Sequence, residues 1–480
     1  MSILKKHEES DKKKANKKID AELPFFITIV TLLATSGFGP YTIFLKIKDL
    51  ELLPNVRLES LKILKRIDIL GKDPLVVMSE TNEKGSSFGD FLSGWVSSIQ
   101  SGGDVVNYLR TKMNSAFEIY EMQQGELAKK VETLIETYMT MQVVVLAVYI
   151  IITATSTGGV GTVPGPDDMD PLMMVIVMPP AVSILFLLMA HKLNKSKVKE
   201  LDWKKILMFG IPGILGAVAI MTLDVMPGYD LYILGIALII SAVWPALNFK
   251  SKYKFSLDAE SATAQIMRDV AEARKAGLGP EKCVIRTTKR NDYGSFTKVS
   301  NGIANKLEWG MTLDDIFGYI RKEVTDFQIL INFKVLFEII SAGGGNVNTL
   351  NTLAGVAEKM KNIEKTKREK LKPYVMVGFM LIAITGFTTL LVIESLTSLG
   401  ADLETDEVKG LALEAEAKSR FELLGIAILI QSWIAGLFLG KITTGSYSGG
   451  FMFSIILVAI TIGAILVIQL KIFSVASIYG

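Results

Sequence analysis

The sequence predicts an all-α, polytopic membrane protein with about seven transmembrane helices and two duplicated helical-bundle domains on the cytoplasmic side. Three observations support this prediction: long apolar segments, a pair of glycine motifs that occurs twice, and helical periodicity in the polar segments. Of the 480 residues, 50% are hydrophobic, and the mean hydropathy is +0.38. This composition is too apolar for an ordinary soluble protein and is typical of a chain that crosses a membrane several times.

Seven segments are long and apolar enough, or nearly so, to cross a bilayer, which takes about 20 mostly apolar residues in a helix. They are Thr137–Thr155, Pro171–Ala190, Ile206–Leu223, Leu231–Leu247, Tyr374–Ile393, Phe421–Gly440 and Phe451–Leu470. The interiors of these segments carry no ionisable residue, and Gln431 is their most polar mid-span side chain. The pair Gly436 and Gly440 offers a small-residue face on which a neighbouring helix can pack closely.

An eighth uncharged segment, Leu23–Leu45, is not predicted to be a span, and its apolar run Leu23–Thr35 is predicted to be a buried core helix. The sequence Gly-Phe-Gly-Pro at 37–40 breaks the helix near the middle of this segment. The related segment later in the chain is too charged to enter lipid. The extra hydrophobicity of Leu23–Leu45 suggests the hypothesis that it packs on the membrane spans or on another subunit.

Loop charges predict the orientation in the membrane. The loop 191–205 contains six lysines, whereas the loop 156–170 has three aspartates and no basic residue. Because short cytoplasmic loops are enriched in lysine and arginine, the first loop is assigned to the cytoplasm. We therefore expect a multi-pass protein of the cell membrane with its N-terminus in the cytoplasm and its C-terminus outside. The lysine-rich residues 1–21 are expected to remain cytoplasmic as a basic tail.

Two glycine motifs occur twice in the same order. A Gly-x-Gly-Pro motif returns after 240 positions, and a double glycine returns after 242 positions. The motif residues are Gly37, Gly39, Pro40, Gly102 and Gly103 in the first copy and Gly277, Gly279, Pro280, Gly344 and Gly345 in the second. The matching order and spacing indicate a duplicated domain, in which these residues form structural turns between helices.

The duplication and the spans divide the chain into five parts. These are a basic cytoplasmic tail (1–21), the first copy (22–136), four transmembrane helices (137–248), the second copy (249–373) and three transmembrane helices (374–480). Apolar residues at helical spacing predict a helical bundle in each copy. The residues that share a face are Leu58, Leu61, Leu64 and Ile67 in the first copy and Phe333, Leu336 and Ile340 in the second.

No catalytic, cofactor or metal site is predicted, and the chain is not expected to be an enzyme. It has one cysteine, Cys283, and two distant histidines, His7 and His191, which cannot form a Cys/His metal cluster or a hydrolytic triad. A nucleotide-binding loop is also missing, because the nearest match, at 436–443, has the wrong spacing and is better explained by helix packing. No cofactor is therefore expected.

A basic cluster in the second copy is the candidate site for a partner. Its residues are Arg286, Lys289, Arg290 and Lys298. Either these charges are simply a solvated face, or they dock an acidic protein, since charge steers association and orientation. We favour the second interpretation because the cluster lies far from the predicted spans. Nucleic acid is not expected, since no aromatic residues are interleaved as in a base-stacking surface.

This organisation resembles that of a known family, the inner-membrane platform proteins of type II secretion, type IV pilus and archaellum machines. Two helical domains, each with Gly-x-Gly-Pro and a later glycine-rich turn and each leading into a span, are similar to the duplicated F domain of that family. The extra spans between the copies and the segment 440–446, followed by Gly449 and Gly450, are most like the archaellum platform branch (FlaJ-like), and an adhesive-type pilus platform is the alternative within the family. Met452 and Phe453 stand where that branch often has a Lys-His pair.

The resemblance implies a function in which this chain catalyses no reaction itself. Such a platform couples a hexameric cytoplasmic secretion-type ATPase to insertion of pilin-like subunits into a growing filament, and acts in the bilayer as a homodimer or small homo-oligomer. Arg286, Lys289, Arg290 and Lys298 then become the candidate ATPase contact. Two alternatives remain open, a membrane transporter and a membrane scaffold unrelated to filaments. The uncharged spans disfavour the transporter, and the scaffold predicts normal filaments in a deletion strain.

Overall fold

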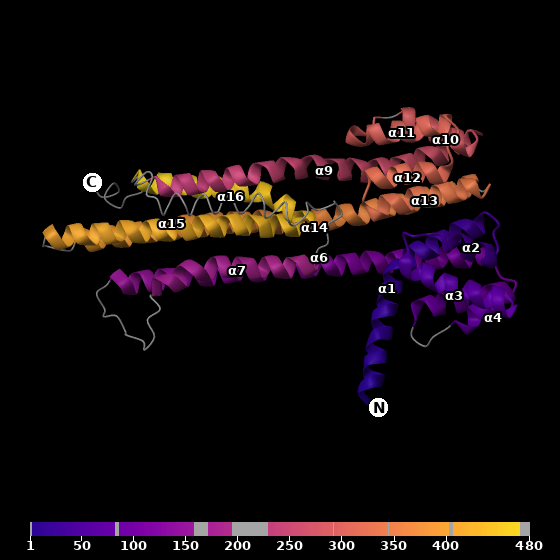
Figure 1. The fold of residues 1–480 in the computed structure, drawn as a ribbon, viewed down its shortest axis with the longest axis horizontal. Helices are drawn as coiled ribbons and strands as arrows, with labels where there is room; N and C mark the ends of the chain where they lie inside the picture. The colour runs from indigo at the N-terminus through magenta and orange to yellow at the C-terminus, as the bar shows by residue number, and fades with distance from the viewer. Residues whose placement is uncertain are drawn as a thin grey trace. The chain divides into compact units, whose positions relative to one another are not determined.

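The computed structural model describes residues 2–81, 86–157, 171–193, 229–290, 292–343, 345–402 and 407–470. Throughout these ranges the regular structure is helical and contains no strand, which confirms the predicted all-α fold. The helices of the described residues are α1 (Ser2–Thr35), α2 (Pro40–Ile47), α3 (Pro54–Leu70), α4 (Pro74–Glu80), α5 (Ser87–Gln100), α6 (Val105–Thr157), α7 (Pro171–Leu193), α9 (Asp230–Lys275), α10 (Pro280–Arg290), the short 3-10 helix η1 (Gly294–Phe296), α11 (Thr297–Glu308), α12 (Leu313–Glu323), α13 (Phe327–Ser341), α14 (Val347–Asp402), α15 (Glu407–Thr444) and α16 (Tyr447–Gln469) (Figure 1).

Among the described residues, five helices are long and apolar enough to cross a membrane: α6, α9, α14, α15 and α16. They contain five of the seven predicted spans. The predicted span Pro171–Ala190 lies in α7, whose apolar helix Val177–Leu193 is shorter, and Ile206–Leu223 lies outside the described residues. The count of about seven spans is thus approximate.

The chain folds into two compact units. One consists of Met1–Gly125 and Lys254–Lys365 and is called the charged unit; the other consists of Glu126–Tyr253 and Thr366–Gly480 and is called the apolar unit. Helices α6, α9 and α14 each begin in one unit and end in the other. The charged unit contains nearly all of both sequence copies, so the two predicted bundles share one compact body. Their boundaries at 22–136 and 249–373 remain a prediction.

Within the charged unit, α1 supplies much of the core. Phe26, Val30 and Leu32 are fully buried there, and α1 contacts α13 of the second copy. This agrees with the prediction that Leu23–Leu45 is not a span and that its run Leu23–Thr35 is a core helix. The apolar side chains of α1 are buried in the core that the two copies share, and this burial explains why the segment is so hydrophobic. The hypothesised contact with the spans or with another subunit is not needed to explain it. The predicted tail 1–21 is not separate from this helix, because α1 begins at Ser2.

Ring and ion-pair contacts join the two copies inside the charged unit. The ring centroids of Phe25 and Phe327 are 4.9 Å apart in an edge-to-face arrangement. The Arg321 guanidinium lies 2.6 Å from a carboxylate oxygen of Glu51, and its hydrogen bond and charge lower the pKa of Glu51. These exposed charges contribute little to stability, so the shared apolar core is the main connection between the copies.

The repeated Gly-x-Gly-Pro motifs form the same turn. Gly37 and Gly277 have left-handed backbone angles, with φ of 92° and 86°, which favour glycine. The Gly37 N–H donates to Ala34 O at 2.9 Å, and the Gly277 N–H donates to Arg274 O at 3.0 Å. Pro40 and Pro280 then begin α2 and α10, where the missing N–H of proline costs nothing. Gly39 and Gly279 do not have a positive φ, and Gly39 is instead the N-cap residue of α2.

The double-glycine turns also correspond, with one extra residue in the second copy. Gly102 (φ 68°) ends α5, and Gly343 (φ 71°) occupies the same place after α13. A side chain two residues after Gly102 and three residues after Gly343 then caps the next helix: Asp104 accepts from the Asn107 N–H at 3.0 Å, and Asn346 accepts from the Thr349 N–H at 2.7 Å. Gly103 has no positive φ, Gly345 has a φ of 48°, and Gly344 lies outside the described residues.

The apolar unit is organised around α15. In the most apolar 18 residues of α15, 83% are buried, against 33–39% in the other four candidate spans. Helices α7 and α16 pack along α15 (Figure 1). The predicted contact role of Gly436 and Gly440 is confirmed, because a Cβ atom on either glycine would overlap the backbone of α16 at Ser454 or Gly450. Glycine therefore allows the two helix backbones to touch.

Candidate functional site

The candidate partner site lies on α10 and α11 of the charged unit. Helix α10 is strongly amphipathic: Cys283, Val284, Thr287 and Thr288 are buried. The three basic residues predicted on this helix, Arg286, Lys289 and Arg290, are all exposed. Lys298 is exposed on α11, which packs against α10. The structure thus places all four predicted residues at the surface of one helix pair.

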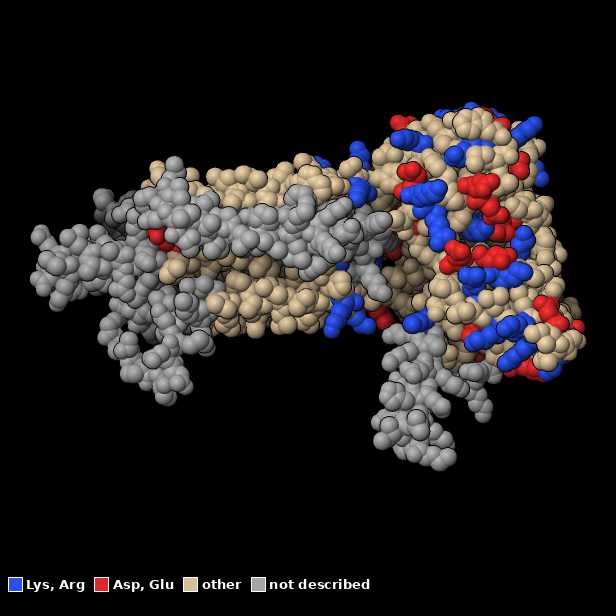
Figure 2. Space-filling model, viewed as in Figure 1, with Lys and Arg blue, Asp and Glu red and all other residues tan. Residues whose placement is uncertain are grey.

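One of these cations has an intramolecular partner. The Lys289 Nζ lies 2.6 Å from Oε2 of Glu308 at the end of α11, and both side chains are about two-fifths exposed. A pair this exposed contributes about 0–1 kcal/mol, so an acidic partner can replace Glu308 at small cost. The surface of the charged unit shows acidic and basic groups interspersed (Figure 2). The basic face of α10 is therefore a local excess of positive charge on a surface of mixed charge.

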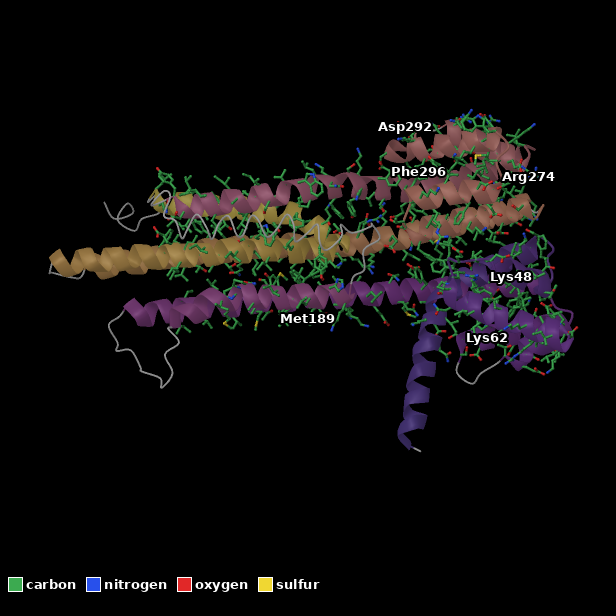
Figure 3. All side chains as sticks on the ribbon, viewed as in Figure 1. Lys48, Lys62, Met189, Arg274, Asp292 and Phe296 are labelled. Carbon is green, nitrogen blue, oxygen red and sulfur yellow. The ribbon has the colours of Figure 1, made fainter. Side chains whose placement is uncertain are left out.

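Arg274, whose position is labelled in Figure 3, was not predicted as a site residue, and it links the two glycine motifs of the second copy. Its Nε donates to Gly345 O at 2.8 Å, and its Nη1 donates to Leu278 O at 2.7 Å. A Cβ on Gly345 would lie 2.7 Å from the Pro280 ring, so the two turns touch. The first copy has Ala34 at the equivalent position, 240 residues earlier. This link fixes the start of α10, and with it the basic face, in the second copy only.

A buried lysine closes the hairpin between α15 and α16 in the apolar unit. Helix α15 continues past the predicted span end at Gly440, and Lys441 is only 1% exposed. Its Nζ donates to Gly445 O at 2.5 Å and lies 4.5 Å from the ring centroid of Tyr447, which stacks on His191. Gly445, with φ of 73°, makes the turn. The segment 440–450 is thus a tight hairpin between two packed helices.

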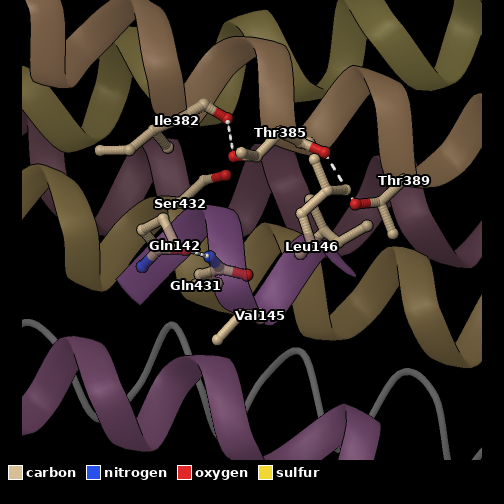
Figure 4. A pocket seen from close by; sticks show the side chains of 10 residues that line it. Gln142, Val145, Leu146, Ile382, Thr385, Thr389, Gln431 and Ser432 are labelled. Atoms are coloured by element: carbon tan, nitrogen blue, oxygen red, sulfur yellow. Dashed lines mark hydrogen bonds between the residues drawn. The ribbon is translucent and has the colours of Figure 1, made fainter. Parts of the chain in front are cut away.

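A small polar cluster lies among the apolar helices (Figure 4). The Gln431 amide on α15 donates to the side-chain oxygen of Gln142 on α6, and both side chains are buried. Next to them is a cavity with about 10 Å³ of space for water centres, also lined by Thr385, Thr389 and Ser432. This is room for about one water molecule. The sequence pointed to Gln431, while Gln142 was overlooked although it interrupts an equally apolar run.

Over the described ranges, no group of three or more His, Cys, Asp or Glu side chains is placed to hold a metal ion. Cys283 is buried, and burial raises the pKa of its thiol. A thiol with a raised pKa is a poor nucleophile at neutral pH. The basic face itself consists of exposed charged side chains, which suit electrostatic recognition.

Comparison with known proteins gives one match. Residues 25–153 match the family model described as "Type II secretion system (T2SS), protein F". No curated protein and no solved structure matches the chain. The matched region contains nearly all of the first sequence copy, from Phe25 in α1 onward, and most of the first predicted span. Members of this family are membrane platform proteins and are not known as enzymes. The match supports the resemblance to secretion and pilus platform proteins, and apolar helices and family together fit a multi-pass membrane protein.

Proposed function

We propose that the chain is the cell-membrane platform of an archaellum or type IV pilus-like assembly machine. In this role it couples a cytoplasmic hexameric ATPase to the insertion of pilin-like subunits into a filament, as a homodimer or small homo-oligomer. The match of residues 25–153 to the protein F family is the observation that carries the proposal. The N-terminus and the charged unit would lie in the cytoplasm, and the C-terminus outside, as the loop charges predict.

Two features of the structure support a partner that supplies the energy. The charged unit presents the exposed cations of α10, with Lys298 on α11, which suit an acidic protein surface. Arg274 and the two glycine turns fix the start of α10 against the start of α14, a helix that continues into the apolar unit. We therefore assign Arg286, Lys289, Arg290 and Lys298 to the ATPase contact, and the paired turn residues to the geometry of the copies.

The test is binding of the full chain, in detergent or nanodiscs, to the purified secretion-type ATPase of the same host. A fragment of the second copy alone is unsuitable, because it would expose core residues such as Phe327 that pack against α1. The variant replaces the four assigned cations, Arg286, Lys289, Arg290 and Lys298, by glutamate. The matched control replaces four other exposed cations of the charged unit by glutamate: Arg110, Lys112, Arg268 and Lys322.

We expect salt-sensitive binding by the wild-type chain that falls by about 100-fold or more in the variant, since reversing charges at a complementary interface costs several kcal/mol. The control should bind within about three-fold of the wild type, because exposed charges away from an interface contribute little. Equal loss in variant and control would leave the platform role standing and remove the assigned contact. Absence of any binding by the folded wild-type chain would contradict the platform role.

A further inference from the structure

Ile69 and Trp309 occupy the same position in the two copies. They are 240 residues apart, the spacing of the Gly-x-Gly-Pro motifs, and they are 72% and 76% exposed. The burial pattern confirms this alignment. The buried residues of α3 include Ser60, Ile63 and Leu64, and the buried residues of α11 include their counterparts 240 positions later, Ser300, Ile303 and Ala304. A single exposed apolar side chain is ordinary, but a large one at the same place in both copies points to a shared use.

A cation accompanies each of these side chains. Arg66 stands three residues before Ile69, and Lys306 stands three residues before Trp309. Residues three apart are neighbours on a helix surface. Tryptophan and arginine are enriched in protein-docking hot spots; Trp309 is in the second copy and Arg66 in the first.

An acid directly precedes each anchor, Asp68 in the first copy and Glu308, which pairs with Lys289, in the second. The Lys306 Nζ lies 4.9 Å from the Tyr319 ring centroid. The exposed cations Lys65, Arg66 and Lys298 outnumber these acids, and this excess favours an acidic partner.

The rest of α3 also differs from the interpretation of the sequence. Leu58 and Leu61, expected on the buried face with Leu64 and Ile67, are 57% and 36% exposed. The buried face of α3 is formed instead by Val56, Ser60, Ile63 and Leu64. Leu58 and Leu61 therefore extend the exposed apolar surface that ends at Ile69. Their equivalents in the second copy are Lys298 and Asn301, so the second surface is more polar around its anchor.

We propose that Ile69 and Trp309 are the apolar anchors of two equivalent docking patches, one on each copy, for the same acidic segment of one oligomeric partner. Patch 1 consists of Leu58, Leu61, Arg66 and Ile69, and patch 2 of Lys298, Lys306 and Trp309. The inference rests on the proposed function, because the partner is the hexameric ATPase, whose neighbouring subunits present the same segment more than once. Two related patches on one chain suit such a repeated ligand, and simultaneous binding at both raises the overall affinity.

Binding of the full-length chain to the purified ATPase tests the anchors. Ile69→Ser and Trp309→Ser are each expected to weaken binding by about 10-fold, and the double variant by about 100-fold or more, since hot-spot truncations cost about 1.4 kcal/mol or more. Ile119→Ser is the matched control, because Ile119 is 51% exposed on α6 of the same unit. It should bind as the wild type does.

Photo-crosslinking tests whether both patches bind the same segment. A crosslinking amino acid is placed at Lys65 or Asn305, which are exposed, 240 residues apart and one turn before the anchors. We expect both positions to label one and the same ATPase peptide. Two results would overturn this inference and leave the proposed function intact. One is that the two positions label different peptides, and the other is that the anchor variants bind like the wild type while the four-cation variant fails. A folded wild-type chain that binds no ATPase overturns both.

Discussion

Gly440→Leu is expected to separate α15 from α16 and to destabilise the apolar unit by about 3 kcal/mol or more, since a side chain forced into a close-packed contact is strongly unfavourable. A Cβ at this position would overlap the Gly450 backbone, and backbone atoms cannot move aside as a flexible side chain can. Gly450 itself lies close to the backbone of Leu437, so both helices lose their closest approach. We would measure thermal unfolding of the purified chain in detergent, with tryptophan emission as the signal.

The chain has five tryptophans, so the emission of Trp433 is isolated as the difference between each protein and its Trp433→Phe counterpart, and this difference reports on the hairpin. Trp433 lies on α15, 9% exposed, with its ring centroid 5.9 Å from that of Phe451 on α16. Separation of the helices should therefore shift the emission to longer wavelength below the unfolding temperature. Gly463→Leu is the matched control, because Gly463 is also on α16 and has open space around it. Equal stability of the Gly440 and Gly463 variants would show that the close crossing does not exist.

Phe25→Ala is expected to destabilise both copies of the charged unit together, by about 3–5 kcal/mol, the usual cost of removing a buried phenylalanine. Phe25 is 4% exposed on α1 and makes edge-to-face contacts with Tyr120 of the first copy and Phe327 of the second. It also borders a cavity lined by Asn332, so the new space joins an existing one. Hydrogen exchange of the full chain measures the effect helix by helix.

The informative readout is exchange in α13, which belongs to the second copy. If the copies share one core, amides of Phe327–Ser341 exchange faster in the alanine variant, as do those of α1. Phe25→Leu keeps most of the apolar volume and should cost less than about 1.5 kcal/mol. Faster exchange in α1 with no change in α13 would contradict the shared core and indicate two independent bundles.

The features predicted correctly from the sequence depend on local properties. Apolar length alone is enough to find candidate spans such as those in α15 and α16, because the bilayer sets the length. The turns at Gly37 and Gly277 were recognisable because a left-handed backbone conformation restricts the residue type. Exposure of Arg286, Lys289 and Arg290 could be expected because α10 alternates buried and charged positions at helical spacing.

The features that escaped prediction depend on contacts between distant residues. That α1 is buried between both copies follows from its contact with α13, about 300 residues later, and no local pattern reports such a pairing. The predicted span Phe421–Gly440 ends just before Lys441 because a charge marks the end of an apolar run, whereas the carbonyl of Gly445 and the ring of Tyr447 allow Lys441 to be buried. The face of α3 was misassigned because Leu58 and Leu61 share the period of core residues. Only the equivalence of Ile69 and Trp309 could have been found earlier, from the 240-residue spacing.

The most direct test of the platform role is the number of surface filaments on host cells whose only copy of the gene carries a defined change. With the gene deleted, we expect no filaments of one type, and restoring the wild-type gene or the control with Arg110, Lys112, Arg268 and Lys322 changed to glutamate should restore them. The variant with Arg286, Lys289, Arg290 and Lys298 changed to glutamate should be present in the membrane at normal amount and fail to restore filaments. Normal filaments of every type in the deletion strain would contradict the role of this chain as an assembly platform.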